Sequence, residues 1–159
     1  DEVMNCHGIG TAKYAQILAS LEMGKRYLAS QIRQTPILNN SQLVKDYITT
    51  QLRHLHREVF AVVFLTNELS LIQFEVLFTG GISSCSVCVR EVLRKSLQYG
   101  ASRLIIAHNH PNTSAQPSKA DLELTQSLAS ACELVDMQLL DHVIVGHNET
   151  KSLKELNLF

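Results

Sequence analysis

The feature that most constrains the fold is a short apolar run that ends in two histidines and a proline. Leu104–Ala107 has the length and composition of a buried strand. Side chains alternate along a strand, so His108 and His110 project to one side while Asn109 projects away. Pro111 ends the strand, because proline cannot donate a hydrogen bond to a neighbouring strand. The run therefore predicts a strand that presents two imidazoles together at its carboxyl end.

A polar loop follows, and Pro117–Asp121 opens a helix with a carboxylate in its first turn. Two histidines and an aspartate suit a catalytic Zn²⁺ that keeps one position open for water, so His108, His110 and Asp121 are candidate metal ligands. Ser118 and Asp121 also match a capping box, which is a purely structural interpretation. The two interpretations are compatible. An N-cap hydroxyl oxygen accepts from a backbone N–H, and its own proton is expected to stay free to donate elsewhere.

Composition limits the classes of protein to consider. The 159 residues are 45% hydrophobic, which is enough for one core with a small appendage. The formal net charge of -1 gives no strong field favouring nucleic acid or an anionic membrane. No apolar run reaches the length of a membrane span and no signal-peptide pattern is present, so we expect no membrane partner. The chain starts at Asp1 without methionine, and we expect it to be a fragment.

Four cysteines, Cys6, Cys85, Cys88 and Cys132, do not make a disulfide framework in a chain of this size. We therefore expect a cytoplasmic, reducing location. Cys85 and Cys88 form a single C-x-x-C, which is open to a redox interpretation. Small residues at the start of a helix are the favoured explanation.

The remaining patterns predict alternating helices and strands. Apolar strands are expected at 58–65 and 71–78, joined by a hairpin at 66–69, and again at 139–145. Helices are expected from about 11 to 33, from 41 to 55, from 86 to 99 and after 118. The order of these elements predicts an α/β fold, with a mixed sheet and helices on its faces.

Residues 1–36 are expected to form a separate helical segment, and residues 37–159 the main domain. The turn at Gly8 and Gly10 resembles the second half of a helix-hairpin-helix, whose amides can approach a DNA phosphate. Lysines and arginines make this segment locally basic: Lys13, Lys25, Arg26 and Arg33. DNA is therefore one expected partner. The alternative is that the glycines only allow a tight turn between helices.

The histidine pair and Asp121 together resemble the JAMM metalloprotease signature of the MPN/JAB superfamily. The chain is more closely similar to the RadC-like (UPF0758) branch, and that similarity covers most of the sequence. It rests on four patches in the family's order: Glu58–Phe60, Val89–Val92, Ala107–Pro111 and Leu140–Gly146. Where the family usually has Ser-Gly after the proline, this chain has Asn112-Thr113. The resemblance implies a three-layer α-β-α sandwich of the JAB1/MPN type, which is related to cytidine deaminases.

The resemblance also implies an activity, which is zinc-dependent hydrolysis of a peptide or isopeptide bond by metal-activated water. Spacing alone does not select the general base from the candidate carboxylates: Glu58, Glu68, Glu75, Glu91 and Asp141. The family's upstream glutamate matches Glu58, and Ser118 would donate to the oxyanion of the tetrahedral intermediate. The expected partner is a peptide or protein substrate, and the oligomeric state is left open.

Two further points stay open at this stage. Asp141-His142 either supplies an acceptor that orients a ligand imidazole or forms a buried polar pair satisfied within the sheet. The alternative function is a DNA-repair-associated accessory protein that binds nucleic acid and has a structural or regulatory metal site. A metal-dependent nuclease is disfavoured, because carboxylates for a second metal ion are not clustered.

Overall fold

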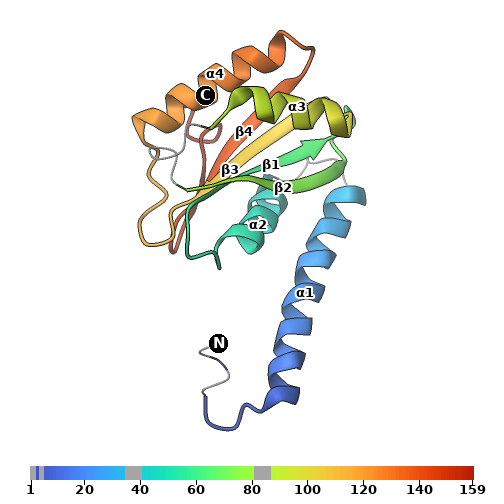
Figure 1. Ribbon diagram of the computed structural model, residues 1–159, viewed down its shortest axis with the longest axis vertical. Coiled ribbons are helices and arrows are strands. Elements are labelled where there is room, and N and C mark those ends of the chain that lie inside the picture. Colours follow the sequence, from blue (N-terminus) through green and yellow to red (C-terminus); the bar gives the residue numbers. More distant parts are fainter. Residues whose placement is uncertain (1–2, 4–5, 35–40, 81–86) are drawn as a thin grey trace.

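The structure is a computed structural model that describes residues 3, 6–34, 41–80 and 87–159. The expected linker at 37–40 and the first cysteine of the C-x-x-C lie outside the described residues. Four helices and five strands follow one another along the chain (Figure 1). In chain order they are α1 (Thr11–Gln34), α2 (Ser41–Leu52), β1 (Val59–Leu65), β2 (Leu71–Thr79), α3 (Val89–Tyr99), β3 (Arg103–Asn109), α4 (Lys119–Glu133), β4 (Gln138–Val145) and β5 (Thr150–Ser152).

The five strands form one mixed sheet in the order β2-β1-β3-β4-β5. β1 and β2 form the predicted hairpin, and β1 also pairs antiparallel with β3. β3 and β4 run parallel, because α4 carries the chain back between them. β5, which the sequence patterns did not predict, adds an antiparallel edge strand to β4.

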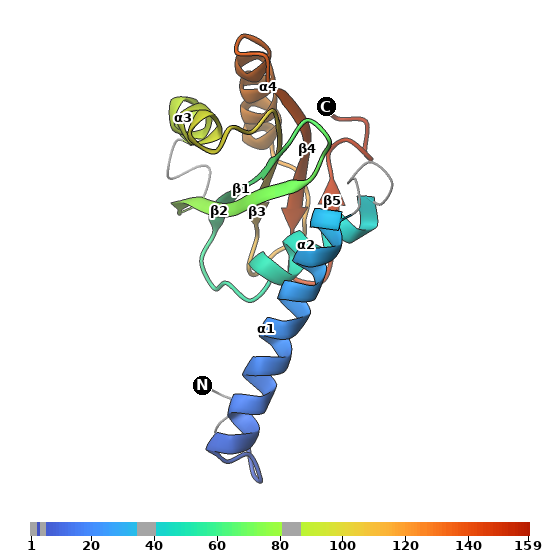
Figure 2. The ribbon, with the colours of Figure 1, turned by 90° about the vertical axis from the view of Figure 1, so that its right-hand side faces the viewer.

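Helices cover both faces of the sheet, which gives the predicted three layers (Figure 2). All seven residues of β1 are buried, because this strand is packed from both sides. Its alternate side chains enter two separate cores. On the α3 and α4 face the core includes Phe60, Val62, Phe64, Val92, Leu104, Ile106 and Leu128. On the α2 face it includes Val44, Ile48, Leu52, Val59, Ala61, Val63 and Ala107.

The helix predicted from Ser86 begins later, at Val89, with exposed Cys88 as its N-cap. The buried side of α3 carries Val92 and Ser96. The Ser96 hydroxyl donates to the Val92 carbonyl at 2.8 Å. Leu97, which follows Ser96 in the chain, has an exposed fraction of 62%. It lies about 100° around the helix from Ser96 and so faces away from the sheet.

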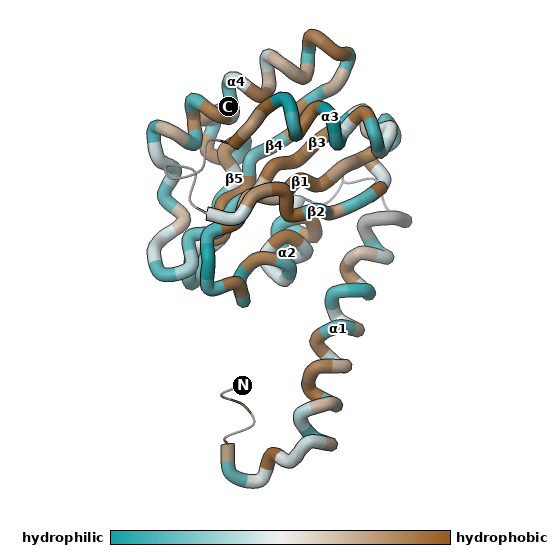
Figure 3. The backbone as a smooth tube through the Cα atoms, in the orientation of Figure 1, coloured by the Kyte–Doolittle hydropathy of each residue, from teal (hydrophilic) through white to brown (hydrophobic). Residues whose placement is uncertain are grey.

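α1 projects from the rest of the protein with its N-terminal end far from the sheet (Figure 1). Its last turns contribute Leu28 and Ala29 to the core on the α2 face. Further toward the N-terminus its large apolar side chains are exposed, and the backbone in Figure 3 is coloured as hydrophobic at intervals along the projecting part. The exposed residues are Ile17, Leu18, Leu21, Met23 and Tyr27. Among the described helices, α1 included, none combines the length and apolar character that a membrane crossing requires.

Candidate metal centre

The three residues expected to bind a metal converge at the carboxyl end of β3. His108 lies in β3, His110 follows the end of that strand, and Asp121 lies in the first turn of α4. His108 Nε2 is 3.0 Å from His110 Nε2 and 3.4 Å from Asp121 Oδ1. The one ligand atom that each residue offers lies within 4.8 Å of the other two. β3 and α4, which are adjacent in the chain, thus bring two nitrogens and one oxygen to a single point.

The N-terminus of α4 sets the direction of the Asp121 carboxylate. Asp121 Oδ2 accepts hydrogen bonds from the Ser118 backbone N–H and from the Ser118 hydroxyl, both at 2.7 Å. The Asp121 N–H donates to Ser118 Oγ at 3.2 Å, which completes the predicted capping box. These contacts occupy Oδ2, so Oδ1 is the oxygen that faces the histidines. The expectation that the Ser118 proton stays free is wrong, because that proton is donated to the carboxylate.

The His110 ring is fixed by the loop that follows it. His110 Nδ1 is 2.9 Å from the carbonyl oxygen of Ser114, and a carbonyl oxygen can only accept. The proton of the neutral ring is therefore on Nδ1, and Nε2 carries a free lone pair directed at His108. The His110 backbone N–H also donates to the Val145 carbonyl at 2.8 Å, which ties the start of the loop to the end of β4.

His108 is almost completely buried, and burial lowers its pKa to about 4 even though the nearby Asp121 carboxylate acts in the opposite direction. His108 Nδ1 lies 2.8 Å from His142 Nε2, and His142 Nδ1 lies 2.6 Å from Thr125 Oγ1. Burial also lowers the pKa of His142 well below its ordinary value. Both rings are therefore neutral near pH 7, the form in which histidine binds metals.

The arrangement fits zinc by its donor set and by its spacing. Zinc prefers histidine nitrogens at about 2.0–2.1 Å and carboxylate oxygens at similar distances in a tetrahedron, whose ligand atoms are then about 3.3 Å apart. The separations of 3.0 and 3.4 Å around His108 Nε2 are close to that value. Three protein ligands leave the fourth tetrahedral position for water or substrate, which is the pattern of catalytic zinc sites.

Glu58 immediately precedes β1, and its side chain is exposed. Phe60, two residues after Glu58, lies opposite His108 where the pairing of β1 with β3 ends. Glu58 is therefore next to the end of the sheet at which His108 lies.

Three other candidate carboxylates lie on β2, on α3 and in the hairpin between β1 and β2. Glu75 accepts from Lys95 at 2.6 Å, and Glu91 forms an ion pair with Arg94 at 2.5 Å. Glu68 is exposed in the hairpin between β1 and β2.

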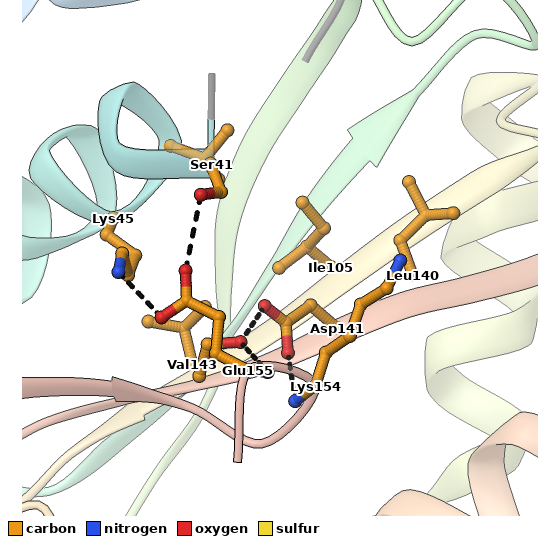
Figure 4. Close-up of a pocket in the computed structure, with 10 residues that line it drawn as sticks. Ser41, Lys45, Ile105, Leu140, Asp141, Val143, Lys154 and Glu155 are labelled. Atoms are coloured by element: carbon orange, nitrogen blue, oxygen red, sulfur yellow. Dashed lines mark hydrogen bonds and ion pairs between the residues drawn. The ribbon is translucent and has the colours of Figure 1, made fainter. Parts of the chain in front are cut away.

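The side chains of Asp141 and His142 point to opposite faces of the sheet, and their direct contact is the hydrogen bond that the His142 backbone N–H donates to Asp141 Oδ1 at 2.7 Å. Asp141 borders a pocket on the α2 side (Figure 4). There its carboxylate accepts from the Ser152 hydroxyl at 2.6 Å and from the Lys154 backbone N–H at 3.1 Å. Burial raises the pKa of Asp141, while these hydrogen bonds act against the shift. The group that contacts a ligand imidazole is His142.

Asn109, whose side chain projects away from the histidines, holds the segment that carries Glu58. Its Oδ1 accepts from the Val59 N–H at 2.8 Å, and its Nδ2 lies 3.2 Å from the Leu55 carbonyl and 3.1 Å from the Arg57 carbonyl. Because Asn109 points away from His108, it reaches the opposite side of β3. The strand thus orders metal ligands on one face and the start of β1 on the other.

Sequence reasoning missed two parts of this site. Thr125 lies four residues after Asp121 on the same helix, a spacing that places both on one face, but nothing in the sequence indicated its contact with His142. Gly146 was noted only as a turn residue, yet a Cβ atom there would lie 2.5 Å from the Ala115 backbone nitrogen. Asn112 and Thr113, where the chain departs from the family's pattern, do not adopt positive φ: among the described residues other than glycine, positive φ occurs only at Leu69, Asp136 and Asn157.

Comparison with known proteins agrees with this geometry. The family model of the RadC-like JAB domain matches residues 38–158. A UPF0758 protein of Psychrobacter cryohalolentis is 64% identical over 158 residues, which are 99% of this chain and 70% of that protein. A UPF0758 protein of Psychrobacter sp. (strain PRwf-1) is 62% identical over 155 residues, covering 98% and 69%. One from Aeromonas hydrophila is 46% identical over 149 residues, covering 94% and 66%. The chain therefore belongs to the RadC-like (UPF0758) family of JAB-domain proteins.

Proposed function

We propose that the protein is a zinc-dependent hydrolase of the JAMM type that cleaves a peptide or isopeptide bond. The observation that carries this proposal is the convergence of His108 Nε2, His110 Nε2 and Asp121 Oδ1. A lone pair on His110 Nε2 directed at a second ring nitrogen 3.0 Å away calls for a cation or a proton between them. A carboxylate oxygen at the same point adds negative charge, which favours a divalent cation.

These three residues would hold a zinc ion, which would lower the pKa of a water molecule toward neutrality and so supply a nucleophile near pH 7. Glu58 takes the proton of the attacking water and delivers it to the leaving amine. Its exposure and its place two residues before Phe60, which pairs with His108, support this role. The chain itself would then supply the base as well as the metal ligands.

Ser118 has two tasks in this proposal. Its hydroxyl holds Asp121 Oδ2 in place, and after rotation it donates to the oxyanion of the tetrahedral intermediate. A donor of this kind typically contributes about 3 kcal/mol to transition-state stabilisation. Loss of the hydroxyl should therefore lower kcat as well as weaken the orientation of Asp121.

The test has two steps. Elemental analysis of the purified protein should find about one zinc per chain, and the variants His108→Ala and Asp121→Ala should lose it. The wild type and the Glu58→Gln variant are then incubated with a peptide library. Cleavage should require the metal and should disappear in Glu58→Gln while zinc stays bound. Equal zinc in wild type and both ligand variants would refute the metal site, and cleavage by Glu58→Gln would refute the role of Glu58.

A second proposal concerns residues 1–36, for which we propose contact with DNA. Gly8 has a φ of 85°, a left-handed conformation that glycine adopts readily, and the Lys13 ammonium donates to its carbonyl oxygen at 2.8 Å. This turn lies at the end of α1 that projects away from the sheet (Figure 1). Binding to duplex DNA should weaken as salt rises and should be lost in Lys13→Glu. Binding that is unchanged by salt or by this variant would contradict the proposal.

The cytoplasmic location remains a prediction from cysteine usage.

A further inference from the structure

A buried chain of hydrogen bonds links the ligand His108 to the helix that carries the ligand Asp121. It runs from His108 Nδ1 to His142 Nε2 at 2.8 Å, and from His142 Nδ1 to Thr125 Oγ1 at 2.6 Å. Thr125 Oγ1 then donates to the Asp121 backbone carbonyl at 2.5 Å. Thr125 and His142 are each at most 1% exposed, so no solvent competes for these groups. The chain therefore connects β3, β4 and α4 behind the candidate metal centre.

The chemistry of each partner sets the direction of every proton in this chain. The Asp121 carbonyl oxygen can only accept, so the single proton of the Thr125 hydroxyl points toward it. Thr125 Oγ1 must then accept from His142 Nδ1–H. A neutral imidazole with its proton on Nδ1 has a lone pair on Nε2, so His142 Nε2 accepts from His108 Nδ1–H. The proton of His108 is therefore on Nδ1.

We propose that Thr125 and His142 are positioning residues that keep His108 Nε2 free of its proton and directed at the metal position. The inference rests on the proposed metal site and not on the hydrolytic activity. The same helix supplies both ends of the arrangement, because Asp121 offers its carboxylate to the metal position and its carbonyl to Thr125. The backbone of α4 thereby determines the tautomer of a histidine on a different element.

Removal of the Thr125 hydroxyl should reverse the direction of the hydrogen bond between His142 and His108. In Thr125→Val the shape of the side chain is kept, but His142 Nδ1–H has no acceptor. A buried N–H without a partner is rarer and more costly than a buried lone pair without one, so His142 should move its proton to Nε2. His142 then donates to His108 Nδ1, and His108 must carry its proton on Nε2, the atom needed for the metal. Thr125→Ser is the matched control, because it keeps the hydroxyl.

Two measurements test the inference. Two-bond ¹H–¹⁵N correlation spectra of the metal-free protein report the tautomer of each histidine, and zinc affinity is measured by competition with a chromophoric chelator. In wild type and Thr125→Ser we expect the Nδ1–H tautomer at His108, and in Thr125→Val the Nε2–H tautomer. Changes to residues that orient a metal-binding histidine through hydrogen bonds typically lower metal affinity 10–100-fold. We expect a loss in that range for Thr125→Val only.

The outcomes separate this inference from the proposed function. His110 is an internal reference, because its Nδ1 partner is the Ser114 carbonyl and should not respond to Thr125→Val. An Nε2–H tautomer at His108 in the wild type would overturn the inference without any variant. So would a Thr125→Val protein with wild-type tautomers and wild-type zinc affinity. A wild type that binds no zinc but shows the expected tautomers would refute the proposed function, while the inferred directions of the hydrogen bonds would still hold.

Discussion

Gly146 offers a sharp test of how the loop after β3 is held. A Cβ atom at this position would lie 2.5 Å from the Ala115 nitrogen, 2.9 Å from the Ser114 carbonyl carbon and 3.0 Å from the Thr113 oxygen. All three are backbone atoms, so no side chain can rotate to make room. To reach an ordinary contact of 3.4 Å, the loop backbone has to move by about 0.9 Å.

A displacement of that size affects both stability and the candidate metal centre. It is large enough to break the 2.9 Å contact between His110 Nδ1 and the Ser114 carbonyl, which fixes the His110 ring. It also strains the bond from the His147 N–H to the Thr113 carbonyl at 2.9 Å. Overpacking typically costs about 1–3 kcal/mol, so Gly146→Ala should lower Tm by roughly 4–8 °C, the shift expected for about 2 kcal/mol.

The assay is thermal unfolding followed by circular dichroism, together with zinc affinity by chelator competition. We expect Gly146→Ala to lose at least about tenfold in zinc affinity, because His110 loses the contact that orients it. Gly24→Ala is the matched control, since Gly24 lies within α1 with no other atom within 4 Å of an added Cβ. It should keep zinc affinity and leave Tm unchanged or higher, because alanine favours helix. Wild-type Tm and affinity in Gly146→Ala would refute this reasoning.

Three further predictions concern single side chains. Ser118→Ala should cost about 1 kcal/mol of the free energy of unfolding through loss of the α4 N-cap, measured by urea denaturation, and Ser118→Thr should restore most of it. Asn109→Leu should cost more, about 2–4 kcal/mol in the same assay, because one buried backbone N–H and two backbone carbonyls lose their partner; a cost below 1 kcal/mol would contradict the bracing role. Burial alone would raise the pKa of Glu75, but hydrogen bonds from two α3 side chains outweigh it and lower the pKa. The contribution of Glu75 to stability should therefore be present above pH 4.5 and be lost as pH falls through the lowered pKa. The free energies of unfolding of wild type and Glu75→Gln should differ at pH 7 and converge in acid. A difference that persists at low pH would count against this account.

The layers of the fold were predictable because the apolar patterns are strong. β1 is a continuous apolar run, and the buried stripe of α2 follows the helical period at Val44, Tyr47, Ile48 and Leu52. β5 was not predictable from hydrophobicity, because Thr150–Ser152 contains no apolar residue. It forms because the edge of β4 offers unpaired backbone groups, to which this segment hydrogen-bonds.

The convergence of His108, His110 and Asp121 was also predictable, because their positions depend on local geometry. Alternation along β3 places the two histidines on one side, and the capping box places Asp121 at the start of α4. The contact between Thr125 and His142 could not be derived in this way. It depends on how α4 packs across β4, and that packing brings together residues separated by 17 positions in the sequence. The orientation of the Ser118 proton likewise depends on a distance that no pattern encodes.

β3 lies in the interior of the sheet, hydrogen-bonded to β1 on one side and to β4 on the other. Amide hydrogens in such a strand typically exchange with solvent only when most of the domain unfolds. We therefore expect the segment that contains His108 to be among the last to unfold. Residues 112–114 and residues 147 and 148 in the turn between β4 and β5 are exposed and are expected to open sooner. Substitutions in those exposed segments would change which molecules reach the site, while β3 would keep its shape.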